Sequence, residues 1–287
     1  MPYGDLEMQK AQCFDSYESL DTAHTTIEER EEYEPYIDMG ATVFAGVDYA
    51  AVLEQAERNA NVVLWDGGNN DLPFFSPDLH FVMLDAHRPG HELTYHPGEA
   101  NFRMADVIVV NKVDSAPPEN VEQLLARTTA MKPDVPVVQG TLELSIEDPE
   151  AIRGARVVIV GDGPTLTHGG MATGAGSVAA DRFGAAEVVD ARPFAVASLA
   201  DTFARFPHLG QEVPAMGYSE AQIRDLEETL RRVPADIVLD ATPAALARRV
   251  HLDKPILNVE YDFVEHGNVL PAILERFEAR SLSCESS

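Results

Sequence analysis

Three short apolar runs lie between residues 62 and 114, and each of them ends in a polar loop. Apolar runs of about four to eight residues, bounded by turn-forming residues, are typical of strands that are buried on both faces of a parallel sheet. Parallel strands need crossover connections, and these are usually helices. The sequence therefore predicts an α/β fold with a mostly parallel sheet, whose first recognisable strands are Val62–Trp65, Phe81–Leu84 and Val107–Val110.

A second series of strands and helices follows a charged segment. Residues 141–154 concentrate acidic side chains and a proline, which marks a boundary. We therefore expect two domains, residues 1–148 and residues 149–287. The second begins with the apolar run Arg156–Val160 and contains the clearest predicted helix, Ser219–Arg232, which starts with a capping-box pattern.

The chain has a formal net charge of −27, because 48 acidic side chains outnumber 21 lysines and arginines. This charge would repel phosphates and anionic lipids, which argues against nucleic acid or a membrane surface as a partner. It indicates an acidic surface suited to high salt. The two cysteines have no disulfide or metal-ligand spacing, and neither a signal segment nor an apolar span of about 18 residues occurs. We expect a cytoplasmic protein.

The run Val107–Val110 leads into Asn111-Lys112-Val113-Asp114, which matches the N-K-x-D pattern that P-loop proteins use for guanine. In that pattern the aspartate carboxylate accepts two N–H donors of the base, and the lysine stem covers the base. An ordinary turn at the end of a strand is the alternative interpretation.

The loop after Val62–Trp65 contains Asp66, Gly67 and Gly68. An aspartate at the end of a buried strand can hold Mg²⁺ directly or through water. Glycines let a phosphate approach the backbone closely. The alternative is a strand-end turn in which the aspartate binds nearby backbone groups.

Basic side chains gather after the second predicted strand. Zinc binding is one interpretation, but no carboxylate or cysteine has the spacing of a further ligand. We prefer an anion cradle formed by guanidinium groups and protonatable imidazoles, and surface histidines are the alternative for each residue singly. The candidate residues are His87, Arg88, His91, His96 and Arg103.

The loop after Arg156–Val160 is a further candidate for anion binding. It precedes a small-residue helix predicted over residues 174–184, where backbone N–H groups can bind an anion. Nothing in the chain matches the P-loop pattern G-x-x-x-x-G-K-[ST]. The candidate residues of this loop are Thr165, His168, Gly169 and Gly170.

Together these clusters resemble the cyclic 2,3-diphosphoglycerate synthetase family, whose relatives are often labelled predicted GTPases. The matching stretches follow in order along nearly the whole chain: MPYGDL, TIEEREEYEPYID, GVDY, LWDGGNNDLPF, RPGHELTYHPGE, NFRMADVIVVNKVD, DGPTLTHGGM, YSEAQIRDLEETL and RRV. The resemblance implies a three-layer, mostly parallel sheet of the P-loop NTPase type in residues 1–148, followed by a second α/β unit. Members of the family carry a Rossmann-like domain and a P-loop before the MPYGDL segment. We therefore expect an incomplete sheet, without its first strand and P-loop, in a haloarchaeal type of member.

The resemblance also implies an activity, the ATP-dependent closure of 2,3-bisphosphoglycerate to cyclic 2,3-diphosphoglycerate, with release of ADP and phosphate. Mg²⁺ would neutralise much of the phosphate charge. By the family motifs, Asp66 would hold the metal, with Asp5 as a further ligand. The nucleotide would be held by Asn111, Lys112, Asp114, Gly67 and Gly68. Asp66, Arg88 and His91 would be the catalytic residues, and the substrate phosphates would contact Arg88, His87, His96, Arg103, Thr165, His168, Gly169 and Gly170.

Two other functions stay open. One is a GTPase that acts on an unknown partner, since N-K-x-D favours guanine in most P-loop proteins, so GTP is the alternative nucleotide. The other is a non-catalytic fragment that binds an anionic metabolite. For the incomplete sheet we expect either a homodimer or a separate chain that supplies the missing part.

Overall fold

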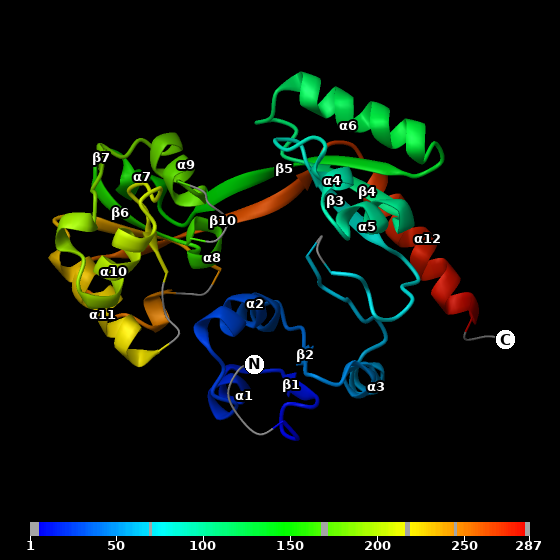
Figure 1. Ribbon diagram of the computed structural model, residues 1–287, viewed down its shortest axis with the longest axis horizontal. Helices are drawn as coiled ribbons and strands as arrows, with labels where there is room; N and C mark the ends of the chain where they lie inside the picture. Colours follow the sequence, from blue (N-terminus) through cyan, green and yellow to red (C-terminus); the bar gives the residue numbers. More distant parts are fainter. Residues whose placement is uncertain (1–5, 69–70, 168–171, 216–218, 244–245, 285–287) are drawn as a thin grey trace. The chain divides into compact units, whose positions relative to one another are not determined.

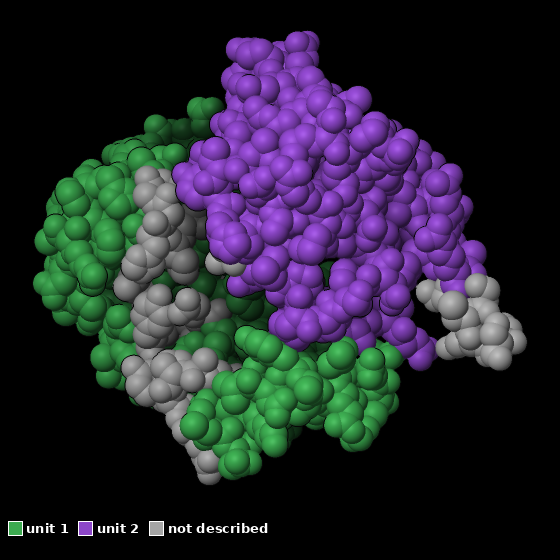
Figure 2. Space-filling view, turned by 45° about the vertical axis from the view of Figure 1, so that its right-hand side comes forward, with its two compact units in different colours: residues 1–60, 144–260 green, residues 61–143, 261–287 purple. Residues whose placement is uncertain are grey.

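The computed structural model describes residues 6–68, 71–167, 172–215, 219–243 and 246–284. The chain divides into two compact units, which Figure 2 shows in different colours. Unit 1 consists of Met1–Ala60 and Leu144–Glu260, and unit 2 consists of Asn61–Glu143 and Tyr261–Ser287. Each unit is therefore built from two separate segments, whereas we expected a single boundary between residues 148 and 149.

Unit 2 contains a sheet with the strand order β3-β4-β5-β10. The strands are β3 (Phe81–Asp85), β4 (Val107–Asn111), β5 (Val137–Ile146) and β10 (Ile256–Glu265) (Figure 1). β3 pairs with β4 in parallel, and so does β4 with β5. All five residues of β4 are buried, as expected for a central strand of a parallel sheet. The prediction of an α/β fold with a mostly parallel sheet is confirmed.

Helices cover both faces of this sheet, so unit 2 has three layers. Alternate residues along β4 face opposite sides. On one side Ile108 and Val110 pack with Phe102 of α5 and Leu124 of α6. On the other side Val107 and Val109 pack with Ile273 of α12, and the partly buried Leu270 joins them. The helices of unit 2 are α4 (His91–Thr94), α5 (Gly98–Met104), α6 (Pro118–Met131) and α12 (Val269–Cys284).

The strand predicted over Val62–Trp65 does not form. Residues 62–65 have no regular secondary structure, and Val62 and Leu64 are 60% and 82% exposed. A strand is stable only when its backbone N–H and C=O groups pair with a neighbouring strand. An apolar run without such a neighbour keeps the composition of a strand but not its structure. The Trp65 ring of this run packs edge-on against the ring of Phe74, at a centroid distance of 5.7 Å.

Unit 1 contains a parallel sheet with the order β10-β9-β6-β7, and β8 pairs with β6 as well. The register brings Val160 of β6 opposite Asp240 of β9. β5 and β10 contribute residues to both units. The remaining strands are β6 (Arg156–Gly161), β7 (Glu187–Val188), β8 (Val213–Pro214) and β9 (Ile237–Ala241).

Two apolar clusters cover the two faces of this sheet. Val158 and Val160 face a cluster that includes Leu199 and Leu230, while Val157 and Ile159 face the other cluster. The predicted helix at residues 219–232 is confirmed as α11, whose N-cap Ser219 accepts a hydrogen bond from the Gln222 N–H. The helices are α7 (Pro149–Ile152), α8 (Gly163–Thr167), α9 (Ala175–Arg182), α10 (Ala197–Arg205) and α11 (Glu220–Arg232), with 3₁₀ turns η1 (Arg192–Phe194) and η2 (Leu246–Arg248).

The N-terminal segment of unit 1 combines a two-stranded antiparallel sheet with three helices. Ser16 and Thr26 each form a capping box at the start of a helix, and Asp48 accepts a hydrogen bond from the Ala51 N–H. The strands are β1 (Gln12–Phe14) and β2 (Val43–Ala45), and the helices are α1 (Tyr17–Thr22), α2 (Ile27–Asp38) and α3 (Tyr49–Asn59). In the part of the chain that the structure describes, no helix is long and apolar enough to cross a membrane.

Candidate functional site

The carboxyl ends of β3 and β4 bring two polar loops together. Asp85, the last residue of β3, stands opposite Asn111, the last residue of β4. The Ala86 N–H donates a hydrogen bond of 3.2 Å to the Asn111 carbonyl oxygen. The segments that follow β3 and β4 therefore stay paired where they leave the sheet. Ligands of open α/β sheets bind at such an edge. This edge is therefore the candidate functional site of unit 2.

Asp85 is the centre of the polar contacts at this edge. Its Oδ2 accepts hydrogen bonds from Nε and Nη2 of Arg88, at 3.0 and 2.8 Å, and from Nζ of Lys112, at 3.0 Å. Its Oδ1 accepts a hydrogen bond of 2.9 Å from the His87 N–H. One carboxylate therefore holds two cationic side chains from two different loops, and these three side chains together carry one net positive charge.

These contacts keep Asp85 ionised. Partial burial by itself raises the pKa of a carboxyl group, because it disfavours the charged form. The hydrogen bonds from Arg88, from the His87 N–H and from Lys112 outweigh this effect and lower the pKa of Asp85 from its ordinary value of 3.8 to about 2. At neutral pH the site therefore contains a carboxylate bound to a guanidinium and an ammonium group.

The N-K-x-D residues lie in the loop that begins at this edge. The Asn111 side chain is buried, and its Oδ1 accepts a hydrogen bond of 2.8 Å from the Lys112 N–H. Lys112 has a φ of 62°, in the left-handed region that residues with a side chain rarely adopt. Asp114 is exposed. The structure therefore leaves the Asp114 carboxylate accessible to a base, while the Lys112 ammonium already contacts Asp85.

Of the predicted anion cradle, His87 and Arg88 lie in this cluster. His87 Nε2 lies 2.9 Å from the Ser115 hydroxyl, which joins the two loops a second time. The Arg88 side chain is 56% exposed, so it is accessible to a ligand. His87 and Arg88, with Lys112, are therefore the predicted basic residues that the structure brings together.

The other basic residues of the predicted cradle make contacts elsewhere. The His91 ring packs against the Tyr95 ring at 4.7 Å. Arg103 forms an ion pair of 2.7 Å with Glu99 on the exposed side of α5, and His96 is exposed. Their roles in phosphate binding stay predictions.

Asp66, Gly67 and Gly68 do not end a strand, because residues 62–65 form none. All three are exposed. A Cβ atom at Gly67 would lie 2.5 Å from the Trp65 indole, so packing against this ring explains the glycine. Asp5, the second expected metal ligand, lies outside the described residues. Within the described part of the chain, no group of three or more His, Cys, Asp and Glu side chains could hold a metal ion. The metal role of Asp66 stays a prediction.

The predicted anion loop of unit 1 is only partly described. The backbone of Thr165 lies in α8, while its side chain and residues His168, Gly169 and Gly170 lie outside the described part of the chain. The start of α9 is occupied by a carboxylate of the chain itself. Glu212, which is fully buried, accepts hydrogen bonds from the Gly174 and Ser177 N–H groups at 2.8 and 2.9 Å. This helix start therefore meets a carboxylate of the chain, although we expected it to offer free N–H groups to a ligand.

Asp85 and two of the buried carboxylates of unit 1, Glu212 and Asp240, were not among the predicted site residues. Burial raises the pKa of Asp240, despite hydrogen bonds that it accepts from Thr242 and the Leu246 N–H. Both Asp85 and Asp240 end or nearly end a buried apolar run, which is the signal that singled out Asp66. That signal would have found them. Glu212 has no comparable signal, because it precedes a strand of only two residues.

Two named proteins are similar to this chain. An arginine synthetase, ArcE, from Thermococcus kodakarensis is 50% identical over 285 residues, which are 99% of this chain and 63% of that protein. A cyclic 2,3-diphosphoglycerate synthetase from Rubrobacter xylanophilus is 24% identical over 136 residues, which are 46% of this chain and 28% of that protein. No model of a known protein family matches the chain.

The chain thus spans less than two thirds of the length of both relatives. We expected a likeness to cyclic 2,3-diphosphoglycerate synthetases along nearly the whole chain, but the match to such a protein covers less than half of it. The match along nearly the whole chain is to a protein with a different named product. Both relatives are named synthetases.

Proposed function

We propose that this chain is part of an ATP-dependent synthetase that forms arginine. The observation that carries the proposal is 50% identity, over 99% of the chain, to a protein named arginine synthetase. The matched residues cover 63% of that protein, so the activity of the whole protein is a proposal for this chain. Among the described residues, the cluster around Asp85 supports a nucleotide site, because its cationic side chains suit phosphate oxygens.

In this proposal the nucleotide phosphates bind at the carboxyl ends of β3 and β4. The Arg88 guanidinium and the Lys112 ammonium are donors that suit phosphate oxygens. In the absence of an anion Asp85 holds both groups at the edge of the sheet. A phosphate that arrives there meets cations that are already oriented, which lowers the entropic cost of binding.

The same cluster has one ligand that suits Mg²⁺. Asp85 is a hard oxygen ligand that stays ionised at neutral pH, and Mg²⁺ is usually bound by one or two carboxylates together with phosphate oxygens. When bound, the ion would neutralise charge on the phosphates. Asp85 would hold it, and Arg88 would then be free to bind a phosphate oxygen instead of this carboxylate.

The exposed Asp114 is the group of this loop that can recognise the base. An ionised carboxylate can only accept hydrogen bonds. Guanine offers two N–H donors on one edge, while adenine offers a single amino group. Under an ATP-dependent function Asp114 would bind the adenine amino group. A preference for GTP would instead support the alternative of a GTPase.

The direct test starts from arginine, because the equilibrium of a synthetase can be approached from the product side. The purified chain is incubated with arginine, ADP, phosphate and Mg²⁺, and the ATP formed is measured by luminescence. The same assay with GDP, and a binding titration with ATP and GTP, separate the two nucleotides. Formation of ATP that requires arginine supports the proposal. If the chain neither forms ATP from arginine nor binds ATP, the proposal fails for this chain.

A second candidate is the formation of cyclic 2,3-diphosphoglycerate, which the partial likeness to the R. xylanophilus protein favours. Phosphorus NMR of a mixture of the chain, ATP and 2,3-bisphosphoglycerate would detect the cyclic product directly. Turnover of bisphosphoglycerate without any reaction of arginine would replace the first candidate by this one. Binding of bisphosphoglycerate without turnover would support the non-catalytic alternative.

A further inference from the structure

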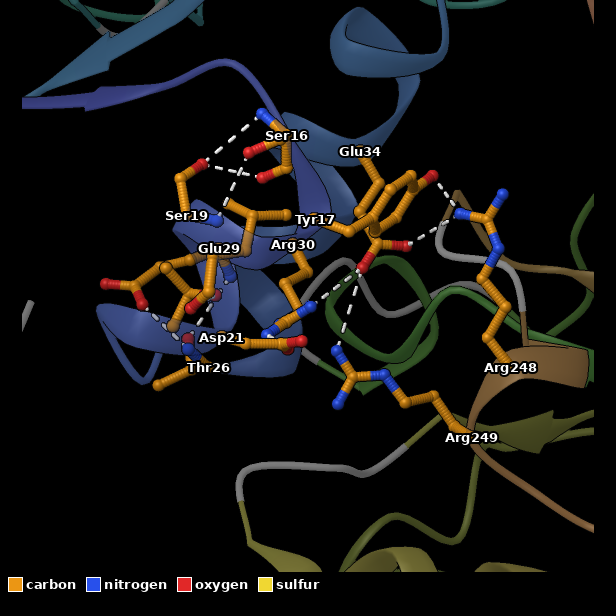
Figure 3. A network of polar contacts seen from close by, with 12 residues as sticks. Ser16, Tyr17, Ser19, Asp21, Thr26, Glu29, Arg30, Glu34, Arg248 and Arg249 are labelled. Atoms are coloured by element: carbon orange, nitrogen blue, oxygen red, sulfur yellow. Dashed lines mark hydrogen bonds and ion pairs between the residues drawn. The ribbon is translucent and has the colours of Figure 1, made fainter.

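Helix α2 of unit 1 carries buried charges, although its sequence, IEEREEYEPYID, is mostly acidic. Arg30 and Glu34 are only 6% and 4% exposed, and they lie one turn apart on the same side of the helix. Arg30 forms ion pairs with Glu34 at 3.3 Å and with Asp21 at 2.5 Å. The Glu34 carboxylate is therefore part of a network of ion pairs and is shielded from solvent (Figure 3).

Two further arginines reach the same carboxylate from a distant part of the sequence. Arg249 Nη2 lies 3.6 Å from Glu34 Oε1, and Arg248 Nη1 lies 3.9 Å from Glu34 Oε2. Figure 3 shows that Arg248, at the end of η2, and Arg249, directly after it, both extend toward α2. Three guanidinium groups thus converge on one buried carboxylate, and they are not equivalent. Arg30 is buried, whereas the Arg248 side chain is 47% exposed.

The guanidinium group of Arg248 lies between an aromatic ring and two carboxylates. Its carbon atom is 4.2 Å from the centroid of the Tyr17 ring, a cation–π distance. It donates a hydrogen bond to the Tyr17 hydroxyl, which in turn donates one of 2.6 Å to Asp38. Nη2 lies 3.6 Å from Asp38. We call Tyr17, Glu34 and Asp38 the guanidinium cage.

The cage has the chemistry that recognises a guanidinium group rather than an ammonium group. A guanidinium ion is planar, stacks on aromatic faces and presents several N–H donors in one plane. The cage offers an aromatic face together with acceptors at its rim. A lysine ammonium is a compact and strongly hydrated charge, so it would stack on the ring less favourably and could not bind both carboxylates through one planar group.

Arg248 is hydrogen-bonded to Tyr17, but its contacts with the two carboxylates of the cage are loose. Its distances to the two carboxylates, 3.6 and 3.9 Å, are longer than hydrogen bonds, and nearly half of its side chain is accessible to solvent. Exchange of this guanidinium for a free one would leave the charge of the cage unchanged, so it would not leave the buried Glu34 unpaired. The cage is thus occupied by an arginine side chain, which a ligand that carries a guanidinium group can replace.

We propose that the guanidinium cage is a binding site for the guanidinium group of a free ligand, and that Arg248 occupies it when the ligand is absent. The identification of this ligand as arginine rests on the proposed function. Arg248 then acts as a competitor that is attached to the protein. If Arg248 fills the cage for about nine tenths of the time, the apparent affinity for a free guanidinium is lowered about tenfold, because only the empty fraction binds.

The test measures binding to the full chain by isothermal titration calorimetry. The probes are methylguanidine and L-arginine, with methylamine and L-lysine as matched ammonium compounds. Arg248→Ala empties the cage, and we expect it to bind methylguanidine about tenfold more tightly than the unchanged chain does. Arg224→Ala is the matched control, because Arg224 is an exposed arginine of α11 that pairs with Glu220 at 3.6 Å outside the cage. It should not change the affinity.

Addition of Asp38→Asn to Arg248→Ala should remove most of the gain, and the ammonium probes should show no gain in any variant. Equal binding of methylguanidine by the unchanged chain and by Arg248→Ala, or no binding by either, would overturn the cage. Circular dichroism checks the fold. If Arg248→Ala does not fold, Arg248→Lys keeps the charge but lacks the planar fork, and it should give a smaller gain in the same direction.

The outcomes for the cage and for the proposed function are distinguishable. If methylguanidine binds as expected but arginine yields no ATP, the cage stands and the proposed function fails. If arginine yields ATP but Arg248→Ala does not change the binding of methylguanidine, the proposed function stands and the cage fails.

Discussion

The replacement Asp85→Asn tests whether this carboxylate holds the cations at the edge of the sheet. The pKa of Asp85 is lowered from 3.8 to about 2, a difference of 1.8 units (3.8 − 2 = 1.8). At about 1.36 kcal/mol for each unit, this corresponds to about 2.4 kcal/mol of folding stability before solvent screening. Because Arg88 is 56% and Lys112 is 36% exposed, screening reduces the expected contribution to about 1–2 kcal/mol.

The pH dependence gives the sign of the effect. The folded-state pKa lies below the unfolded-state value, so the contribution is fully present above pH 3.8 and is lost as the pH falls through about 2. Urea unfolding is measured for both proteins from about pH 7 to about pH 2. The unchanged chain should be more stable by about 1–2 kcal/mol at neutral pH, and most of this difference should be lost near pH 2.

Asp114→Asn is the control, because Asp114 lies on the neighbouring loop but is exposed. It should change the free energy of unfolding by less than about 0.5 kcal/mol at any pH. A stability difference between the unchanged chain and Asp85→Asn that stays constant from neutral to acid pH would refute the reasoning. So would the absence of any difference at neutral pH, since the hydrogen bonds from Arg88 and Lys112 would then contribute nothing.

Three further replacements test other parts of the structure. Glu212→Ala should lower the free energy of unfolding by about 3 kcal/mol or more, because two buried N–H groups lose their acceptor, while Glu212→Gln should cost about 1 kcal/mol. If chemical unfolding gave similar losses for the two variants, this capping role would be contradicted. Leu64→Asp should change the free energy of unfolding by less than about 0.5 kcal/mol, because this side chain is 82% exposed, whereas Ile108→Ala should cost about 2–5 kcal/mol. Thermal unfolding of both variants compares them, and a large loss for Leu64→Asp would mean that residues 62–65 are packed. Lys112→Ala should weaken ATP binding at least about tenfold in a fluorescence titration, because a charge-assisted contact to phosphate contributes about 1.5–3 kcal/mol; Lys132→Ala, whose ammonium contacts the Arg103 carbonyl instead, should not.

Much of the candidate site was predictable from the sequence. Parallel strands place their carboxyl ends at one edge, so the loops after Phe81–Leu84 and Val107–Val110 were expected to meet, and they do. This brings Arg88 and Lys112 to one carboxylate. That carboxylate is Asp85 rather than Asp66, because β3 pairs with β4, while residues 62–65 pair with no strand in the described part of the chain.

The charged network of α2 could not be predicted from local sequence. Glu34 lies in an acidic stretch that favours a solvated face on composition alone, and its partners Arg248 and Arg249 are more than two hundred residues away. Whether a charged residue is buried depends on the element that packs on it. The sequence pattern of α2 does not indicate which element that is. The same holds for Glu212, whose hydrogen bonds reach Gly174 and Ser177 on α9.

The sequence by itself determined the class of the fold and the local starts of helices. Apolar runs such as Val107–Val110 specify buried parallel strands, and Ser16, Thr26 and Ser219 begin helices through contacts within three residues. Tertiary structure alone decided which apolar runs become strands and which charges are buried. Val62–Trp65 and Val107–Val110 have similar patterns, yet only the second is a strand. The physical reason is that a strand's hydrogen bonds and a buried charge's partners lie on other elements, so their formation depends on neighbours that a local pattern does not specify.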